Sequence, residues 1–106
     1  MKYISIIILI FTGYTTKTEN IYLKLPSLFS DGVILQRDTT FSIWGFSKPN
    51  SNININTSWG VTLKEKSDSF GNWKVLINSG KAGGPHEIEI NSVNEEIIIR
   101  DILFGE

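Results

Sequence analysis

Short runs of alternating hydrophobic and polar residues follow one another along most of this chain. In "NININT", Ile53 and Ile55 would share one face, and in "HEIEIN" the same holds for Ile88 and Ile90. A period of two residues is typical of a β-strand with one buried side. The pattern predicts strands at Ile21–Lys24, Val33–Gln36, Thr40–Phe46, Asn52–Thr57, Val61–Lys66, Trp73–Ile77, Glu87–Asn91 and Glu96–Ile102.

The segments between these runs contain Gly, Pro, Asn, Asp and Ser, the residues that favour turns. The stretch "SDSFGNWKV" predicts a hairpin, with Gly71 at the turn position that requires a positive φ. After this turn, Trp73, Val75 and Ile77 would share one face. "EEIIIRDILF" is nearly continuously apolar, as in a strand covered on both faces, so its register does not follow from alternation.

No segment of the chain has the pattern of a long amphipathic helix. The short runs and their turns therefore predict an all-β fold, namely an antiparallel β-sandwich of the immunoglobulin-like kind. A jelly roll is the alternative. Both faces of "FSIWGF" are apolar, so we expect Trp44 to be buried. Trp73 should be buried with its apolar neighbours, and no helix is expected after Leu25.

The first residues have the layout of a secretory signal peptide. Lys2 precedes an apolar stretch from Tyr3 to Phe11, and small residues follow it. This stretch is too short for a transmembrane helix, which needs ~20 residues, whereas a buried N-terminal strand is an alternative. We expect a signal peptide at 1–16, a single sandwich domain at 17–106, and a periplasmic or secreted protein.

Composition and charge narrow the range of partners. Lys and Arg together number 10 and Asp and Glu 11, which gives a net charge of −1. This balance argues against a nucleic-acid partner, which needs a basic face, and gives no reason to expect binding to an anionic membrane. The absence of cysteine excludes a disulfide, a thiolate nucleophile and a cysteine-based metal site. We expect neither a cofactor nor a metal.

Few residues offer catalytic chemistry, and each has a structural explanation. His86, the only histidine, opens a predicted strand without a nucleophile motif such as G-x-S-x-G beside it. Glu87 and Glu89 share a face, as a glycosidase pair would, but solvated carboxylates on a strand are far commoner. Asp68 and Asn72 lack the further oxygen ligands of a calcium loop, and a turn explains both. We therefore predict no catalytic residue.

Trp59 is the candidate contact residue. It lies in "TSWGV", at the tip of a predicted hairpin next to Gly60. An exposed aromatic ring at such a tip would stack on a sugar or contact a neighbouring domain. The alternative is that the ring folds back onto its own sheet.

The string "LPSLFSDGVILQRDTTFSIWGF" resembles the N-terminal region of bacterial sialate O-acetylesterases, a family of SGNH-type esterases. "SDSFGNWKVLI", "KAGGPHEIEI" and "IIIRDILFGE" continue the similarity in order, so that it covers Leu25 to Glu106. The chain departs from the family's pattern where Val33 and Ile34 stand for Met-Val, where Phe46 stands for Trp, and where "KPNS" lacks a Gly. None of these departures changes the predicted strands.

In that family, the segment similar to "LFGE" leads into the block "CSGQSNM", which holds the nucleophilic serine. The resemblance therefore implies the N-terminal, non-catalytic β-domain of a carbohydrate esterase, and it carries no catalytic residue onto this chain. Its partner would be the C-terminal esterase domain, and O-acetylated glycans would be the substrates of the full-length enzyme. Leu103 and Phe104 would contact that domain and would be exposed without it. The isolated chain is predicted to be inactive.

Two other interpretations stay open. The first is a stand-alone, secreted glycan-binding or adhesion sandwich that uses Trp59 as a stacking platform. The second is a structural domain that completes a separate catalytic chain. The order and spacing of the shared motifs favour the esterase-domain interpretation over both.

Overall fold

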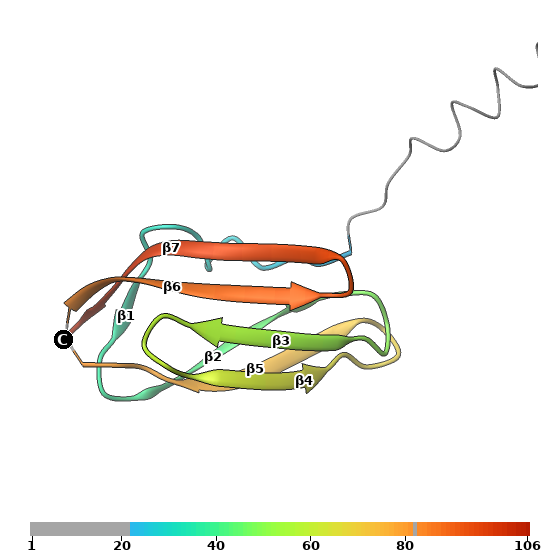
Figure 1. The fold of residues 1–106 in the computed structure, drawn as a ribbon, viewed down its shortest axis with the longest axis horizontal. Coiled ribbons are helices and arrows are strands. Elements are labelled where there is room, and N and C mark those ends of the chain that lie inside the picture. The colour runs from blue at the N-terminus through green and yellow to red at the C-terminus, as the bar shows by residue number, and fades with distance from the viewer. Residues whose placement is uncertain (1–21, 82) are drawn as a thin grey trace, which may run out of the picture.

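The computed structural model describes residues 22–81 and 83–106 (Figure 1). The predicted signal peptide at 1–16 lies outside the described residues. Within the described part, the chain forms seven strands and no helix. The strands are β1 (Ile34–Gln36), β2 (Thr40–Phe46), β3 (Asn52–Thr57), β4 (Thr62–Lys66), β5 (Asn72–Asn78), β6 (Gly83–Ser92) and β7 (Glu95–Gly105).

The strands form two sheets that face each other (Figure 1). One has five strands in the order β1-β7-β6-β3-β4, and the other consists of β2 and β5. The prediction of an all-β sandwich is confirmed. The named strand pairs are antiparallel except at β1, which pairs in parallel with β7 and places Ile34 beside Leu103. Two parallel neighbouring strands need a long connection along the chain. Here that connection contains the five other strands, β2 to β6.

The strands lie close to their predicted positions, with the same bounds for β2 and β3. The predicted strand Ile21–Lys24 is different, and Ile21 is outside the described residues. Lys24 forms an isolated bridge with Phe46, in which the two residues exchange backbone hydrogen bonds of 2.9 Å. The N-terminal segment therefore covers one end of the free edge of β2, where unpaired backbone groups would otherwise face solvent.

Of the two predicted hairpin turns, one joins neighbouring strands of the same sheet and the other joins strands of different sheets. "TSWG" closes a hairpin, because β3 and β4 pair in antiparallel fashion. "SDSFGN" instead carries the chain from the five-stranded sheet to the small one, since β4 pairs with β3 and β5 pairs with β2. The predicted hairpin is therefore wrong, although Gly71 does take a positive φ of 89°. A side chain at Gly71 would also collide with the carbonyl oxygen of Ser47.

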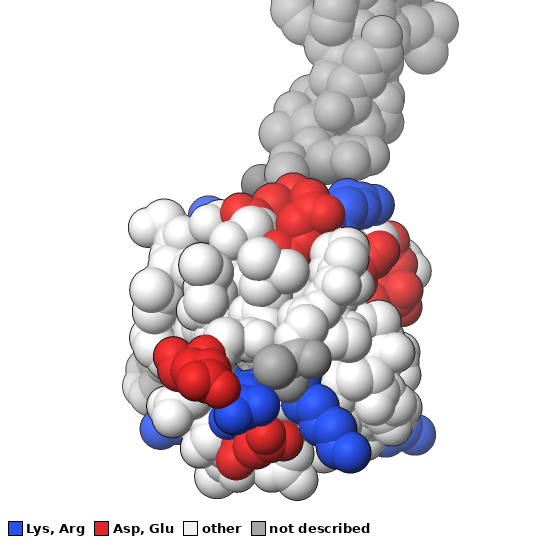
Figure 2. All heavy atoms as spheres, turned by 90° about the vertical axis from the view of Figure 1, so that its left-hand side faces the viewer, with Lys and Arg blue, Asp and Glu red and all other residues white. Residues whose placement is uncertain are grey.

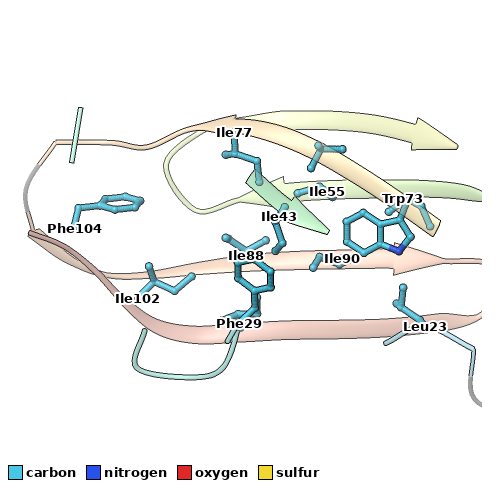
Figure 3. Close-up of a cluster of buried hydrophobic side chains, with 13 residues drawn as sticks. Leu23, Phe29, Ile43, Ile55, Trp73, Ile77, Ile88, Ile90, Ile102 and Phe104 are labelled. Carbon is cyan, nitrogen blue, oxygen red and sulfur yellow. The ribbon is translucent and has the colours of Figure 1, made fainter. Parts of the chain in front are cut away.

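The core lies between the two sheets and consists mainly of isoleucine (Figure 3). Isoleucine suits strands because it is β-branched, and each fully buried side chain contributes about 1.5–3 kcal/mol. The shared faces predicted for "NININT" and "HEIEIN" are both confirmed, since all four isoleucines are buried. The buried hydrophobic side chains are Leu23, Phe29, Ile43, Ile53, Ile55, Trp73, Val75, Ile77, Ile88, Ile90, Ile99, Ile102 and Phe104.

Trp73 is buried as predicted, at 4% exposure, whereas Trp44 is 40% exposed. The prediction that Trp44 is buried is therefore wrong, and the register explains why. Gly45 lies directly opposite Trp73, and Cζ2 of Trp73 is 3.0 Å from the position that a Cβ of Gly45 would take. Gly45 thus leaves room for the inward indole. Because neighbouring strand residues point to opposite faces, Trp44 points outward.

β7 changes the face that it buries in the middle of its length. Ile99 points inward, and farther along the strand the inward residues are Ile102 and Phe104. The pairing with β6 shifts at this point, next to Asp101 with its φ of 56°. An extra residue in one strand moves the alternation by one position. Before the shift, Ile97, Ile98 and Ile99 are all at least half-buried, so that both faces of β7 are partly covered there. Beyond the shift only one face is covered, since Leu103 is exposed.

We expect Gly45→Ala to destabilise the domain. A methyl group there would collide with the backbone oxygen of Lys24 and crowd Trp73. Overpacking of a dense core costs about 1–3 kcal/mol, so the free energy of unfolding in urea should fall by that amount. Gly105→Ala is the matched control, because a Cβ there would meet Ile34 at an ordinary 3.6 Å. Equal losses in both variants would contradict this account of the packing.

Candidate functional site

Three of the residues singled out from the sequence meet where β7 ends. The ring centroids of Trp59 and Phe104 are 4.7 Å apart in an edge-to-face arrangement. The imidazole of His86 lies 5.0 Å from Phe104 and 5.4 Å from Trp59. The three side chains come from the β3–β4 turn, from β6 and from β7, so this aromatic cluster joins elements that are distant in sequence.

Trp59 is half-buried at the tip of its hairpin. Its indole Nε1 donates a hydrogen bond of 2.8 Å to the carbonyl oxygen of Asn78, and its Cβ packs beside Gly80. The ring therefore folds back onto its own domain, which was the alternative to a free tip. A contact between the exposed part of Trp59 and a sugar or a domain stays a prediction.

Leu103 and Phe104 lie on opposite faces of β7. Leu103 is 45% exposed and lies beside Ile34, which is 69% exposed, so that the two form a small apolar surface that we call the β1–β7 patch. Phe104 is 3% exposed and belongs to the domain's own core. The expectation that Phe104 is exposed in the isolated chain is therefore wrong, because the shift in β7 turns this residue inward.

A serine and a histidine lie within hydrogen-bond distance beside the aromatic cluster. Ser58 Oγ is 3.1 Å from Nδ1 of His86 and accepts a 2.9 Å hydrogen bond from the backbone N–H of Glu87. A serine nucleophile needs a base that a third group orients, together with donors for the oxyanion. In the described part of the chain, no hydrogen bond joins His86 to a carboxylate. The pair thus tethers the hairpin tip to β6.

The other acidic candidates also have structural surroundings. Glu87 and Glu89 line a hollow of about 270 Å³ beside the hairpin tip, and Glu89 accepts a 2.8 Å hydrogen bond from the side chain of Asn91. Over residues 22–81 and 83–106, no three His, Asp or Glu side chains gather as a metal-binding group. The same residues contain no helix long and apolar enough to cross a membrane.

Asp68 organises the turn between the two sheets. Its Oδ1 accepts hydrogen bonds of 2.9 Å from the backbone N–H groups of Asn72 and Phe70. These bonds, above all the one from Asn72, favour the ionised carboxylate and hold the pKa of Asp68 below its usual 3.8. The turn therefore accounts for both residues that resembled part of a calcium loop.

The outer face of the small sheet carries aromatic residues that sequence reasoning placed in the core or passed over. Trp44 and Phe46 alternate along β2, opposite Lys74 and Asn72 of β5. The sequence "IWGF" contained a signal for this outward orientation. If Gly45 faces inward, its two neighbours along the strand, Trp44 and Phe46, must both face outward. A hollow of about 530 Å³ on this face is lined by Trp44, Gly45, Phe46, Asp68, Asn72, Trp73 and Lys74.

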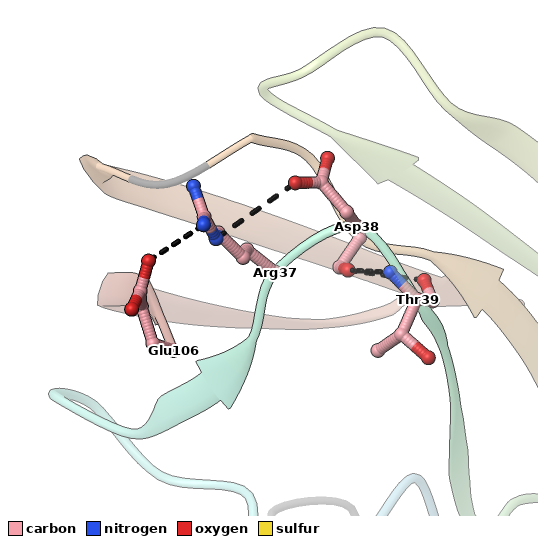
Figure 4. Close-up of polar contacts among 5 residues, drawn as sticks. Arg37, Asp38, Thr39 and Glu106 are labelled. Carbon is pink, nitrogen blue, oxygen red and sulfur yellow. Dashed lines mark hydrogen bonds and ion pairs between the residues drawn. The ribbon is translucent and has the colours of Figure 1, made fainter.

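The end of the sandwich near Glu106 has an uncharged centre with charged side chains of both signs around it (Figure 2). The guanidinium of Arg37 lies 2.6 Å from the carboxylate of Glu106 and 3.9 Å from that of Asp38 (Figure 4). The backbone N–H of Arg37 also donates to the carbonyl of Gly105 at 2.9 Å. Exposed ion pairs contribute about 0–1 kcal/mol, so Arg37 mainly aligns the last residues of β7 with β1.

Comparison with known proteins gives a consistent picture. No protein-family model matches the chain. The sialate O-acetylesterases of Homo sapiens and Pongo abelii are each 24% identical to it, over 88% of this chain and 20% of the relative. Among solved structures, a carbohydrate acetylesterase from Xanthomonas citri is 37% identical with a TM-score of 0.74, over 79% of this chain and 19% of that one.

The chain is therefore a β-sandwich relative of the carbohydrate acetylesterases. More narrowly, its curated relatives are sialate O-acetylesterases, which confirms the resemblance found in its motifs. The chain spans about one fifth of the length of the relatives that it matches.

We expect Phe104→Ala to lower the free energy of unfolding by about 3–5 kcal/mol, the cost of removing a large buried aromatic ring. Leu103→Ala is the matched control on the same strand, and its exposed side chain should cost less than about 1 kcal/mol. Urea unfolding followed by far-UV circular dichroism measures both values. Similar losses in the two variants would mean that Phe104 does not hold the aromatic cluster together.

We expect Asp68→Asn to change how stability depends on pH, because Asn keeps an oxygen acceptor but does not titrate. In the parent, the lowered pKa stabilises the folded state above about pH 3.8, and this contribution is lost as the pH falls through the folded-state pKa. The parent should therefore melt above the variant at neutral pH, and the difference should vanish in strong acid. A difference that is constant across thermal melts at all pH values would refute this role.

Proposed function

We propose that this chain is the N-terminal, non-catalytic domain of a sialate O-acetylesterase-like carbohydrate esterase. The main support for this proposal is how unequally the matches cover the two proteins. They cover 79–88% of this chain but only 19–20% of the relatives. The larger part of each relative thus lies outside the similarity. In this proposal, that larger part contains an esterase domain. Its serine takes up the acetyl group as an acyl-enzyme, and water then hydrolyses the acyl-enzyme.

The chemistry of the described residues supports a non-catalytic role. Ser58 and His86 are close enough for a nucleophile and its base, but Ser58 Oγ also accepts the N–H of Glu87 and so serves the local fold. His86 is packed against Phe104 and Trp59 in the aromatic cluster. This arrangement favours rigidity of the hairpin tip over proton transfer to and from a substrate.

We place the contact with the esterase domain at the end of the sandwich near Glu106. The β1–β7 patch of Ile34 and Leu103 is apolar and lies on an edge of the five-stranded sheet. Exposed apolar surface of this kind commonly marks an interface. The half-exposed ring of Trp59 is at the same end and would contribute to the contact. The segment 1–16 would direct the protein to the periplasm or outside the cell, where O-acetylated glycans are its substrates.

The proposal is tested with a hybrid in which this chain replaces the matching segment of the Xanthomonas citri carbohydrate acetylesterase. The hybrid should hydrolyse p-nitrophenyl acetate, while this chain alone should not exceed the rate in buffer. In the hybrid, Leu103→Asp should lower the melting temperature by several degrees, because it places a charge in an apolar contact. In the isolated chain the same substitution should have little effect, since Leu103 faces solvent.

Leu76→Asp is the matched control, because Leu76 is also an exposed leucine but lies on β5 of the small sheet. It should leave the hybrid's melting temperature near that of the parent. Hydrolysis by the isolated chain that disappears in Ser58→Ala would overturn the proposal. Such a result would assign catalysis to the pair of Ser58 and His86 instead.

A further inference from the structure

The outer face of the small sheet carries two cross-strand pairs of side chains, each with one residue from β2 and one from β5. Trp44 lies directly across from Lys74, and Phe46 lies directly across from Asn72. All four residues are exposed, while their neighbours along both strands point into the core. The face thus combines two aromatic rings with an ammonium group and an amide, at spacings that the β2–β5 register determines.

Trp44 is held in place although it is on the surface. Its ring meets that of Phe29 edge to face, with centroids 4.8 Å apart and an interplanar angle of 84°. Phe29 itself is buried in the core. A side chain held in this way loses little conformational freedom when a ligand binds, which favours affinity.

The surface around these residues is hollowed on both sides of β5. The first hollow, of about 530 Å³, is lined by the side chains of the outer face, Trp44, Phe46, Asn72 and Lys74, and by Asp68. Lys74 also lines a second hollow of about 510 Å³, whose other lining residues are Leu63, Lys64, Glu65, Val75 and Leu76. Each volume lies within the range of small-ligand sites, about 300–1,000 Å³.

We propose that this face binds an acidic oligosaccharide. A sugar ring stacks on Trp44 and Phe46, its carboxylate pairs with the ammonium group of Lys74, and its hydroxyl groups bond to Asn72 and Asp68. The choice of a carbohydrate rests on the proposed function, because the relatives are carbohydrate and sialate esterases. The acidic character of the sugar follows from the ammonium groups, since Lys74 lines both hollows and Lys64 also lines the second. Each hollow contains one carboxylate as well, that of Asp68 in the first and that of Glu65 in the second.

The composition of the face favours a sugar over a protein partner. The centre of a protein interface is depleted of charged residues, especially Lys and Asp. Here Lys74 is the direct cross-strand neighbour of Trp44, and Asp68 lines the same hollow. Sugars need this combination, since they have an apolar ring face and hydroxyl groups around its edge. A protein surface covering the hollow would have to desolvate both charged groups.

The test uses the full chain and two sugars, 3′-sialyllactose and its neutral counterpart lactose. Binding is measured by isothermal titration calorimetry and by the indole N–H signals in NMR spectra. We expect 3′-sialyllactose to bind more tightly than lactose and to shift the signal of Trp44 more than that of the buried Trp73. Trp44→Ala should weaken binding of 3′-sialyllactose at least tenfold.

Lys74→Gln separates the charge from the stacking contribution. It should reduce the affinity for 3′-sialyllactose severalfold and leave that for lactose unchanged. Ile34→Ala is the matched control, because it removes an exposed apolar side chain from β1, and it should change neither affinity. Far-UV circular dichroism confirms that each variant is folded, and Phe46→Ser provides a second test of stacking if Trp44→Ala is unfolded.

Three outcomes would overturn the proposal. One is that neither sugar binds at millimolar concentration. Another is that binding survives both Trp44→Ala and Phe46→Ser, and a third is that the face instead mediates self-association that these substitutions abolish. Hydrolysis of p-nitrophenyl acetate by the hybrid enzyme involves no sugar. Failure of sugar binding is therefore distinguishable from failure of the proposed domain function.

Discussion

The two-stranded sheet of β2 and β5 requires burial of its inner face against the five-stranded sheet. Two strands alone are at best marginally stable in water, so the small sheet depends on the core that both layers share. That contact is possible because Gly45 leaves the space into which Trp73 packs. Because Gly45 faces inward, its neighbour Trp44 points outward. Because β4 and β5 belong to different sheets, the turn at Asp68 crosses from one layer to the other.

The opposite end of the molecule depends on the change of face within β7. Without the shift near Asp101, Leu103 would point inward and Phe104 outward. With it, Phe104 enters the core and anchors Trp59 and His86, while Leu103 joins Ile34 on the surface. One irregularity in one strand therefore creates both the rigid aromatic cluster and the apolar patch that we assign to a neighbouring domain.

The two surfaces that carry our proposals differ in chemistry. The β1–β7 patch is formed by aliphatic side chains on an edge of the larger sheet, as suits contact with another protein domain. The outer face of β2 and β5 combines aromatic, amide and ammonium groups in hollows of ligand size. A domain with both surfaces would join an esterase to its glycan without contributing a catalytic group.

The sequence by itself determined the positions of the strands, the isoleucine core and the positive φ of Gly71, because alternation and turn chemistry are local properties. It also carried the family resemblance, which the relatives confirm. Tertiary structure alone decided that β5 pairs with β2, that Trp44 faces outward, and that Phe104 is buried. A strand with apolar residues on both faces has two possible orientations, and the choice between them depends on the partner strand. In this protein, Gly45 opposite Trp73 makes that choice for β2, and the shift opposite β6 makes it for β7.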